Sequence, residues 1–297
     1  MPIGLITHMD TTRPEDVVDI VTNVDYESTP FFSTIEESSA SNTLHEWLTD
    51  SYDASAHNAA VEGSDATIVD LTQPTRTTNV VQAFRKVISV SDTQRAIPHY
   101  GNNDPYSYQL NKKMIELARD TEKALIAGTR ASGASGVARQ MNGAIALITT
   151  NKTARTSGTS FTETEFNNMV AGIYDSGTDM NVDKVFVGSY LKRVISGFNG
   201  GATVNVDAEV KKIWNTVSIY ESDFGIHMIH LSREVPTGAV LAVDSSKWRK
   251  AFLVNRRFQH VPLAKTGSST KGMVEGELTL EALNEASSAY RSGYFAG

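Results

Sequence analysis

Leu44-His45-Glu46-Trp47-Leu48 and, about thirty residues later, the stretch from Asn79 to Ser91 both show the alternation of apolar and polar residues that is typical of β-strands. The residues between them are rich in Ala, Ser, Asp and Thr and only weakly apolar. A structureless loop of this size is uncommon inside a compact domain, so we expect a long two-stranded hairpin that projects from the body of the protein. Because two strands alone cannot bury their faces, another chain is expected to cover them.

Charged residues are segregated along the chain. The 297 residues have a formal net charge of −7, yet no Lys or Arg occurs from Pro14 to Thr75. The thirteen acids of that stretch are Glu15, Asp16, Asp19, Asp25, Glu27, Glu36, Glu37, Glu46, Asp50, Asp53, Glu62, Asp65 and Asp70. The stretch from Ser245 to Val274 has no acid and seven basic residues: Lys247, Arg249, Lys250, Arg256, Arg257, Lys265 and Lys271. Either these runs are solvated surface, or the acidic segment, which repels itself, lies against basic surface of its own or a neighbouring chain.

The N-terminal residues predict an arm with two apolar anchors. Thr12-Arg13-Pro14-Glu15 has the pattern of a capping box and opens a short helix that must end before Pro30. The apolar stripe of this helix consists of Val17, Ile20, Val21 and Val24. The second anchor, on an otherwise polar strip, consists of Phe31, Phe32 and Ile35.

A long helix is predicted from Pro105 to Ala127, because Asp104 is a good N-cap and proline favours the first turn. At this length it spans roughly 34 Å, and Gly128 ends it. Its expected buried stripe is Leu110, Met114, Leu117, Ala118, Ala124 and Leu125. Its expected surface pairs at i,i+3 are Lys113–Glu116, Glu116–Arg119 and Arg119–Glu122.

The following residues alternate between strand and helix patterns, which indicates a separate α+β or α/β lobe. The expected strands are Gly143–Thr149, Val182–Val187, Thr216–Tyr220, Ile226–Leu231 and Ala239–Val243. The expected helices are one that the capping box at Ser160-Phe161-Thr162-Glu163 opens and that runs through Tyr174, and one from Ser189 to Phe198. From Val274 to Leu283, acidic and apolar residues alternate, which predicts a strand with one exposed face.

We predict no catalytic, cofactor-binding or metal-binding residues. The chain has no cysteine, which excludes disulfides and thiolate metal sites. Gly128 and Gly133 have the spacing of a phosphate loop, but the lysine such a loop needs is missing. His227 and His230 are three residues apart in a predicted strand and should therefore point to opposite faces. No apolar run is long enough to cross a bilayer, and no secretory signal is recognisable, so we expect a soluble, intracellular protein with no membrane partner.

The order of these features resembles that of tailed-phage major capsid proteins of the SU-ten type, which share the Hong Kong 97 (HK-97-like) capsid fold. Three strings carry the resemblance: Thr29-Pro30-Phe31-Phe32-Ser33-Thr34-Ile35, Leu44-His45-Glu46-Trp47 and Ala138-Arg139-Gln140-Met141-Asn142-Gly143. It covers essentially the whole chain and implies an α+β fold. The implied regions are an N-terminal arm (1–40), an extended β-hairpin loop (41–92), a peripheral domain (93–140 and 258–297) with a spine helix (105–127), and an axial α/β-type domain (141–257).

The resemblance implies a structural protein that is not an enzyme. It would self-assemble, in the host cytoplasm, into the hexamers and pentamers of an icosahedral virion head that encloses double-stranded DNA without sequence-specific binding. A separate scaffold protein is expected, and decoration and portal proteins are possible partners. Two alternatives stay open: an encapsulin-like bacterial nanocompartment shell, which differs in its cargo, and an enzyme with an unrecognised site in the axial lobe.

In the implied shell, the arm and the hairpin lie across neighbouring subunits. We therefore expect some acids between Glu36 and Asp70 to contact basic residues of another subunit. The candidate inter-subunit contact residues are Phe31, Phe32, Glu36, Glu37, Asp50, Asp53, Glu62, Asp65, Asp70, Lys247, Arg249, Lys250, Arg256 and Arg257. Hinges are expected near Pro74 and Pro98, because proline marks the ends of elements.

Overall fold

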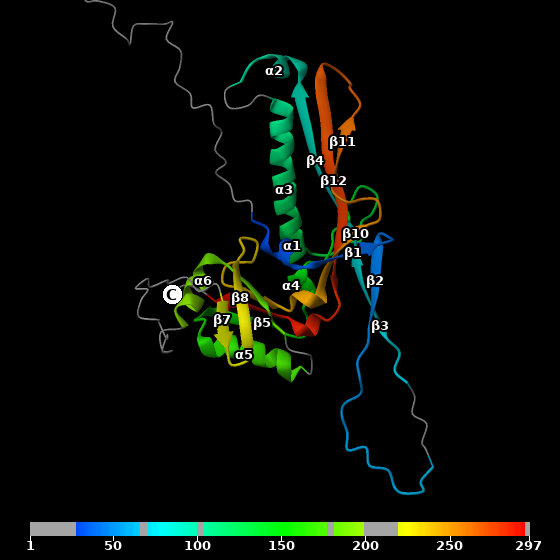
Figure 1. Cartoon of the computed structure of the whole chain (residues 1–297), viewed down its shortest axis with the longest axis vertical. Helices are drawn as coiled ribbons and strands as arrows, with labels where there is room; N and C mark the ends of the chain where they lie inside the picture. Colours follow the sequence, from blue (N-terminus) through cyan, green and yellow to red (C-terminus); the bar gives the residue numbers. More distant parts are fainter. Residues whose placement is uncertain (1–27, 66–70, 100–103, 177–180, 199–218, 295–297) are drawn as a thin grey trace, which may run out of the picture.

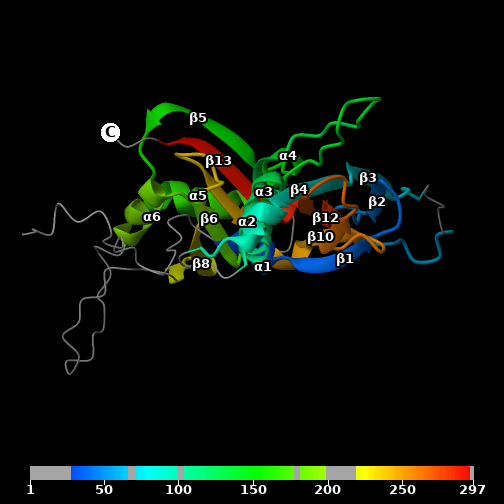
Figure 2. The same ribbon diagram turned by 90° about the horizontal axis from the view of Figure 1, so that it is seen from above.

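The computed structural model describes residues 28–65, 71–99, 104–176, 181–198 and 219–294. Within these ranges the chain forms two larger β-sheets, a two-stranded hairpin and one long helix (Figures 1 and 2). The helix expected after Thr12 and the first residues of the strand expected from Thr216 lie outside the described residues.

The strand β12 (Ser269–Ala282) forms the centre of the first sheet. It pairs antiparallel with β4 (Gln82–Ser91) along one edge, and with β10 (Trp248–Leu253) and β11 (Gln259–Leu263) along the other. β1 (Glu36–Ala40) pairs with β10 as a parallel strand. The arm strand and the basic segment therefore lie in one sheet.

The long helix α3 (Pro105–Ala127) lies along this sheet, and its predicted bounds are confirmed (Figure 1). The Asp104 carboxylate caps it by accepting two backbone N–H groups of the first turn. The short helix α2 (Asp92–Ala96) connects β4 to it. The predicted surface pair of Lys113 and Glu116 is also confirmed, at 2.7 Å between Nζ and Oε2.

Three residues of α3 differ in burial from the prediction. Met114 and Ala118, which were expected in the buried stripe, are exposed, Met114 to 51%. Glu122, which was expected on the outer face, is 1% exposed because α1 (Pro30–Thr34) covers it. The i,i+3 spacing identifies residues that share a helix face, but it does not identify the face that a distant segment covers.

The second sheet has the strand order β5-β13-β9-β6-β8-β7. Its strands are β5 (Lys152–Thr159), β13 (Ala289–Tyr294), β9 (Val240–Val243), β6 (Lys184–Val187), β8 (Gly225–Leu231) and β7 (Ile219–Ser222). Residues of α5 (Glu163–Asp175) and α6 (Ser189–Ser196) share the core on one face. On the other face, Phe186 of β6 belongs to the core that contains Phe31 and Trp248. The mixed lobe predicted from the alternation is confirmed.

The buried strand predicted from Gly143 to Thr149 is wrong, because the segment forms a single helical turn, α4 (Ala144–Leu147). A short apolar run fits a buried strand and a buried turn of helix equally well. Gly143, which precedes this turn, lies very close to the end of α3. A β-carbon there would lie 2.6 Å from the Gly128 nitrogen and 2.7 Å from the Ile126 oxygen.

The prediction that β12 has one exposed face is also wrong. Glu275 and Glu281 are buried, and Glu277 is half-buried. Arg256, on the connection from β10 to β11, pairs with Glu275 at 2.9 Å and with Glu277 at 3.0 Å. Arg139 adds a second contact to Glu277 at 3.3 Å. The acidic face of β12 is thus covered by basic side chains of its own chain.

The sheets divide the chain differently from the regions that the resemblance implies. β10 begins at Trp248 and belongs to the first sheet, although residues 141–257 were assigned to the axial domain. β13 belongs to the second sheet, although residues 258–297 were assigned to the peripheral domain. β4 pairs with β12 over its whole length instead of continuing the hairpin, which is therefore shorter than residues 41–92.

We expect Gly143→Ala to lower the free energy of unfolding by about 2–3 kcal/mol, because the methyl group meets backbone atoms that cannot move aside. Gly172→Ala in α5 is the matched control: a β-carbon there has no neighbour within 4 Å, and alanine favours a helix by up to about 1 kcal/mol. Urea unfolding of both variants measures the difference. Equal stabilities would contradict the steric constraint at Gly143.

Candidate assembly surface

The predicted projecting hairpin is present. β2 (Leu44–Thr49) and β3 (Thr75–Val80) pair antiparallel, with Leu44 opposite Val80 and Thr49 opposite Thr75. The described residues of the connecting loop extend away from both sheets (Figure 1). The large apolar side chains of that loop, Tyr52, Val61 and Leu71, are all exposed. The hairpin thus presents apolar surface that the described part of its own chain does not cover.

The base of the hairpin is fixed to the end of β12. Trp47 is buried, and its indole Nε1–H donates to the Ala282 carbonyl at 2.7 Å. Asn79 is fully buried and donates from Nδ2 to the carbonyls of Leu280 at 2.8 Å and Asn142 at 3.1 Å. Its Oδ1 also accepts the N–H of Asn142 at 2.9 Å. The base is held by buried hydrogen bonds, so a movement of the hairpin as a whole must break them.

These contacts account for the string from Ala138 to Gly143 that carries the resemblance. Arg139 covers Glu277, Met141 is fully buried, and Asn142 is hydrogen-bonded to Asn79. The string therefore joins the hairpin base to β12 and to the end of α3. Sequence reasoning recognised the string but did not identify Asn79 as its partner.

Glu281 of β12 links the hairpin base to the arm. Its Oε2 lies 3.7 Å from His45 Nε2 of β2 and accepts the Ser38 hydroxyl of β1 at 2.8 Å. His45 and Ser38 hold the pKa of the Glu281 carboxyl below its usual value. One carboxylate thus contacts both segments predicted to cross onto neighbours.

The acids of the hairpin loop have no ion-pair partner among the described residues. Asp50, Asp53, Glu62 and Asp65 are all exposed, and no ion pair within the described ranges involves them. Asp70 lies outside the described residues. Nearer the base, Glu46 pairs with Arg76 across the two strands at 3.4 Å.

The arm is anchored to its own chain at α1. Phe31 is fully buried, with its ring centroid 5.3 Å from that of Phe186 and 6.3 Å from that of Trp248. Phe31 therefore belongs to the core of its own subunit, which corrects the expectation that it contacts another one. Phe32 is half-buried, and the Lys250 ammonium lies 4.0 Å from its ring centroid.

The first acids after α1 pair with the basic segment of the same chain. In the parallel register of β1 and β10, Glu36 lies opposite Arg249 and Glu37 opposite Lys250. Glu36 contacts Arg249 at 3.3 Å, and Glu37 contacts Arg257 at 2.6 Å. The hydrogen bond from Arg257 lowers the pKa of the Glu37 carboxyl.

Sequence-derived candidates thus fall into two groups. Glu36, Glu37, Arg249, Lys250, Arg256 and Arg257 already pair within the chain. Asp50, Asp53, Glu62, Asp65 and Lys247 have no ion-pair partner in the described part of the chain.

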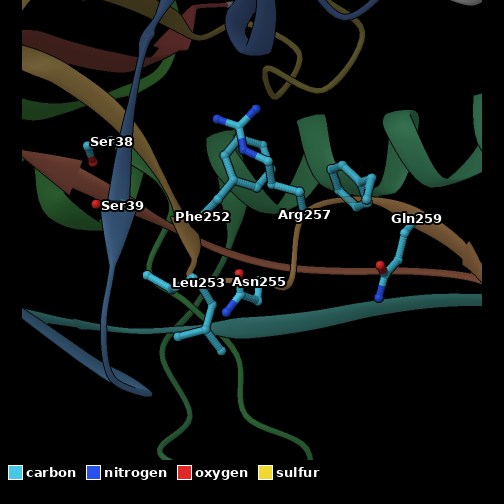
Figure 3. A pocket seen from close by; sticks show the side chains of 9 residues that line it. Ser38, Ser39, Phe252, Leu253, Asn255, Arg257 and Gln259 are labelled. Carbon is cyan, nitrogen blue, oxygen red and sulfur yellow. The ribbon is translucent and has the colours of Figure 1, made fainter.

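A hollow of about 560 Å³ lies beside the arm strand (Figure 3). Ser38 and Ser39 of β1 lie on one side of it and Gln259 on the other, with the Arg257 guanidinium 4.9 Å above the Phe252 ring between them. Its lining contains no carboxylate or histidine that could act as an acid or base.

Two further properties bear on the class of protein. Within the described residues, no group of three His, Asp or Glu side chains is arranged to hold a metal ion. His227 and His230 do lie on opposite faces, as predicted: the His227 ring contacts Phe166, and the His230 ring stacks on Phe186. Across the described part of the chain, no helix is both long and apolar enough to cross a membrane.

Comparisons with known proteins agree with this architecture. The major capsid protein of Escherichia phage Phieco32 is 26% identical over 312 residues, which cover 87% of this chain and 88% of that protein. Among solved structures, the capsid of a native GTA particle matches with a TM-score of 0.68 at 11% identity, over 96% of both chains. The SrpI encapsulin of Synechococcus elongatus matches less closely, with a TM-score of 0.56 at 10% identity, over 93% of this chain and 95% of that one.

The two structural matches show that the chain has the HK-97-like capsid fold, which phage capsids and encapsulins share. The family match distinguishes a phage capsid protein from an encapsulin. The family model described as SU10 major capsid protein matches residues 5–293. This family is structural, and neither it nor the curated relative is an enzyme. The chain therefore belongs to the SU10 major capsid protein family and is a shell-forming subunit of a tailed-phage capsid.

Proposed function

We propose that this capsid subunit assembles into hexamers and pentamers of an icosahedral head, in which the hairpin of each subunit lies across a neighbour. The observation that carries the proposal is the unpartnered hairpin loop. Its large apolar side chains are exposed, and its four acids form no ion pair with the described part of their own chain. A two-stranded hairpin of this kind is marginally stable unless something covers it.

The acids of the loop determine the charge of the surface that is expected to cover it. Asp50, Asp53, Glu62 and Asp65 carry like charges and favour a basic neighbour. Lys247 is the first candidate, because its ammonium has no partner within the described residues of its own chain. Arg249 and Arg257 are further candidates, since their pairs with the arm leave them partly exposed. Each exposed pair contributes only about 0–1 kcal/mol, but the contacts repeat around a closed shell.

The same assembly gives the other regions their roles. The lobe built on the second sheet, whose strands lie within residues 141–257 apart from β13, would point toward the centres of hexamers and pentamers. The first sheet and α3 would form the periphery of each capsomer. Packaged double-stranded DNA would lie inside without sequence-specific contacts. A separate scaffold protein, and possibly portal and decoration proteins, would be further partners during assembly in the host cytoplasm.

We expect neutralisation of the hairpin acids to impair assembly and not folding. Asp53→Asn with Glu62→Gln removes two exposed charges that form no ion pair with the described residues of the subunit, so the thermal midpoint should stay within about 1 °C. The protein concentration needed for shell formation should rise several-fold, as light scattering and negative-stain imaging would measure it. Added salt should reproduce the effect in the unaltered protein.

The matched control is Asp175→Asn with Glu221→Gln. This variant has the same change in net charge and alters two exposed acids of the second lobe. It should assemble like the unaltered protein. If both double variants assemble equally well, the hairpin acids do not meet a basic neighbour.

The hinge hypothesis concerns the same shell. Pro74 lies immediately before β3 at the loop end of the hairpin, and Pro98 lies between α2 and α3. The expected outcome, on superposing chemically identical subunits of one shell by their first sheets, is hairpin loops related by rotation about these two points. If the hairpin loops coincide in this superposition, there are no hinges at Pro74 and Pro98.

A further inference from the structure

Two charged side chains form hydrogen bonds with the backbone of α1. The backbone N–H of Phe31 donates to Glu122 Oε1 and that of Phe32 to Oε2, both at 2.8 Å. The Lys250 ammonium donates to the Phe32 carbonyl at 2.8 Å. Both charged side chains are largely buried, and each comes from an element distant from α1 in the sequence. The arm thus leaves the core through a clamp made of one residue of α3 and one of β10.

The Glu122 end of the clamp lacks a counter-charge. No lysine, arginine or histidine in the described ranges forms an ion pair with it, and the charged side chain that acts on it is another acid, Glu234. Among the described residues, the N–H groups of Phe31 and Phe32 therefore provide the only hydrogen bonds to this buried carboxylate. Burial of an ionised carboxylate without a counter-charge is costly, so the site favours the neutral form.

We propose that Glu122 is a proton-controlled anchor for the N-terminal arm, which holds α1 firmly while its carboxyl is protonated and loosens as that proton is lost. When α1 lifts off α3, the carboxyl regains water and its usual acidity. Docking of the arm therefore takes up a proton, and the docked state weakens as the pH rises.

The direction of the pH dependence follows from the direction in which the Glu122 pKa is shifted. Burial raises the pKa of Glu122 from the usual 4.5 to about 7, against the opposing effect of the N–H groups of Phe32 and Phe31. A group whose pKa is raised in the docked state stabilises docking most at low pH, and the stabilisation is lost between pH 4.5 and 7. Between pH 5.5 and 8 the opening equilibrium of the arm should rise by roughly 10-fold to 30-fold.

Other ionisable groups around α1 are few and can be separated from Glu122. α1 itself carries none. Lys250 from β10 and its partner Glu37 from β1 lie at the other end of the clamp. His230 from β8 stacks on Phe186, against which Phe31 packs. A substitution that abolishes only the titration of the Glu122 side chain leaves these groups in place.

Hydrogen–deuterium exchange of the full-length, unassembled subunit tests the anchor, because the two N–H groups bonded to Glu122 are themselves exchangeable. After correction for the intrinsic pH dependence of exchange, protection of residues 31–35 should fall by roughly 10-fold to 30-fold from pH 5.5 to 8. Protection of the backbone N–H groups of α3 should not change between these pH values. In Glu122→Gln, which is neutral at every pH, the dependence should disappear.

Glu116→Gln is the matched control on the same helix, since Glu116 forms a surface pair with Lys113 and does not touch the arm. It should keep the pH dependence of the unaltered protein. A pH-dependent arm in Glu122→Gln, or a pH-independent arm in the unaltered protein, overturns the proposal. The second comparison needs no variant and holds even if Glu122→Gln does not fold. The test uses unassembled protein, so its failure leaves the hairpin contacts untouched.

Discussion

The backbone pairing of β12 is the constraint on which the rest of the structure depends. This strand is hydrogen-bonded to β4 along one edge and to β10 and β11 along the other, so every segment of the first sheet takes its position from it. The base of the hairpin is fixed to its last residues through Trp47 and Asn79. Its carboxylates then require cover, which Arg256 and Arg139 provide. A strand that is central in pairing and acidic in composition must gather basic side chains around it.

Local signals in the sequence predicted the elements that depend on local chemistry. The bounds of α3 follow from Asp104, Pro105 and Gly128, whose effects reach only one turn along the chain. The hairpin followed from the length and polarity of its loop. In the second lobe, β6, β7, β8, β9 and the helices α5 and α6 were found within a few residues, because their apolar periodicity is regular. The strands β5 and β13 of the same sheet were not predicted.

Predictions that failed depend on contacts between distant segments. Glu122 meets Phe31 across 91 residues of sequence, so its surface-like spacing on α3 gave no sign of its burial. The alternation on β12 suggested an exposed face. That face is instead covered by Arg139 and Arg256, which come from separate loops. The charge segregation left open whether the acidic residues are solvated or lie against basic surface. Sequence alone did not show that Glu36 and Glu37 pair within the chain, while the loop acids Asp50, Asp53, Glu62 and Asp65 form no ion pair with its described residues.

The parallel pairing of β1 with β10 also sets the order in which the subunit can fold. β1 is made early in synthesis, but its partner begins more than two hundred residues later, with Glu36 opposite Arg249. β10 in turn needs β12, whose last residue is Ala282. Contacts of such long sequence separation form late, because much chain must be ordered first. On the ribosome, a nascent subunit therefore cannot seat its arm strand until nearly the whole chain has emerged.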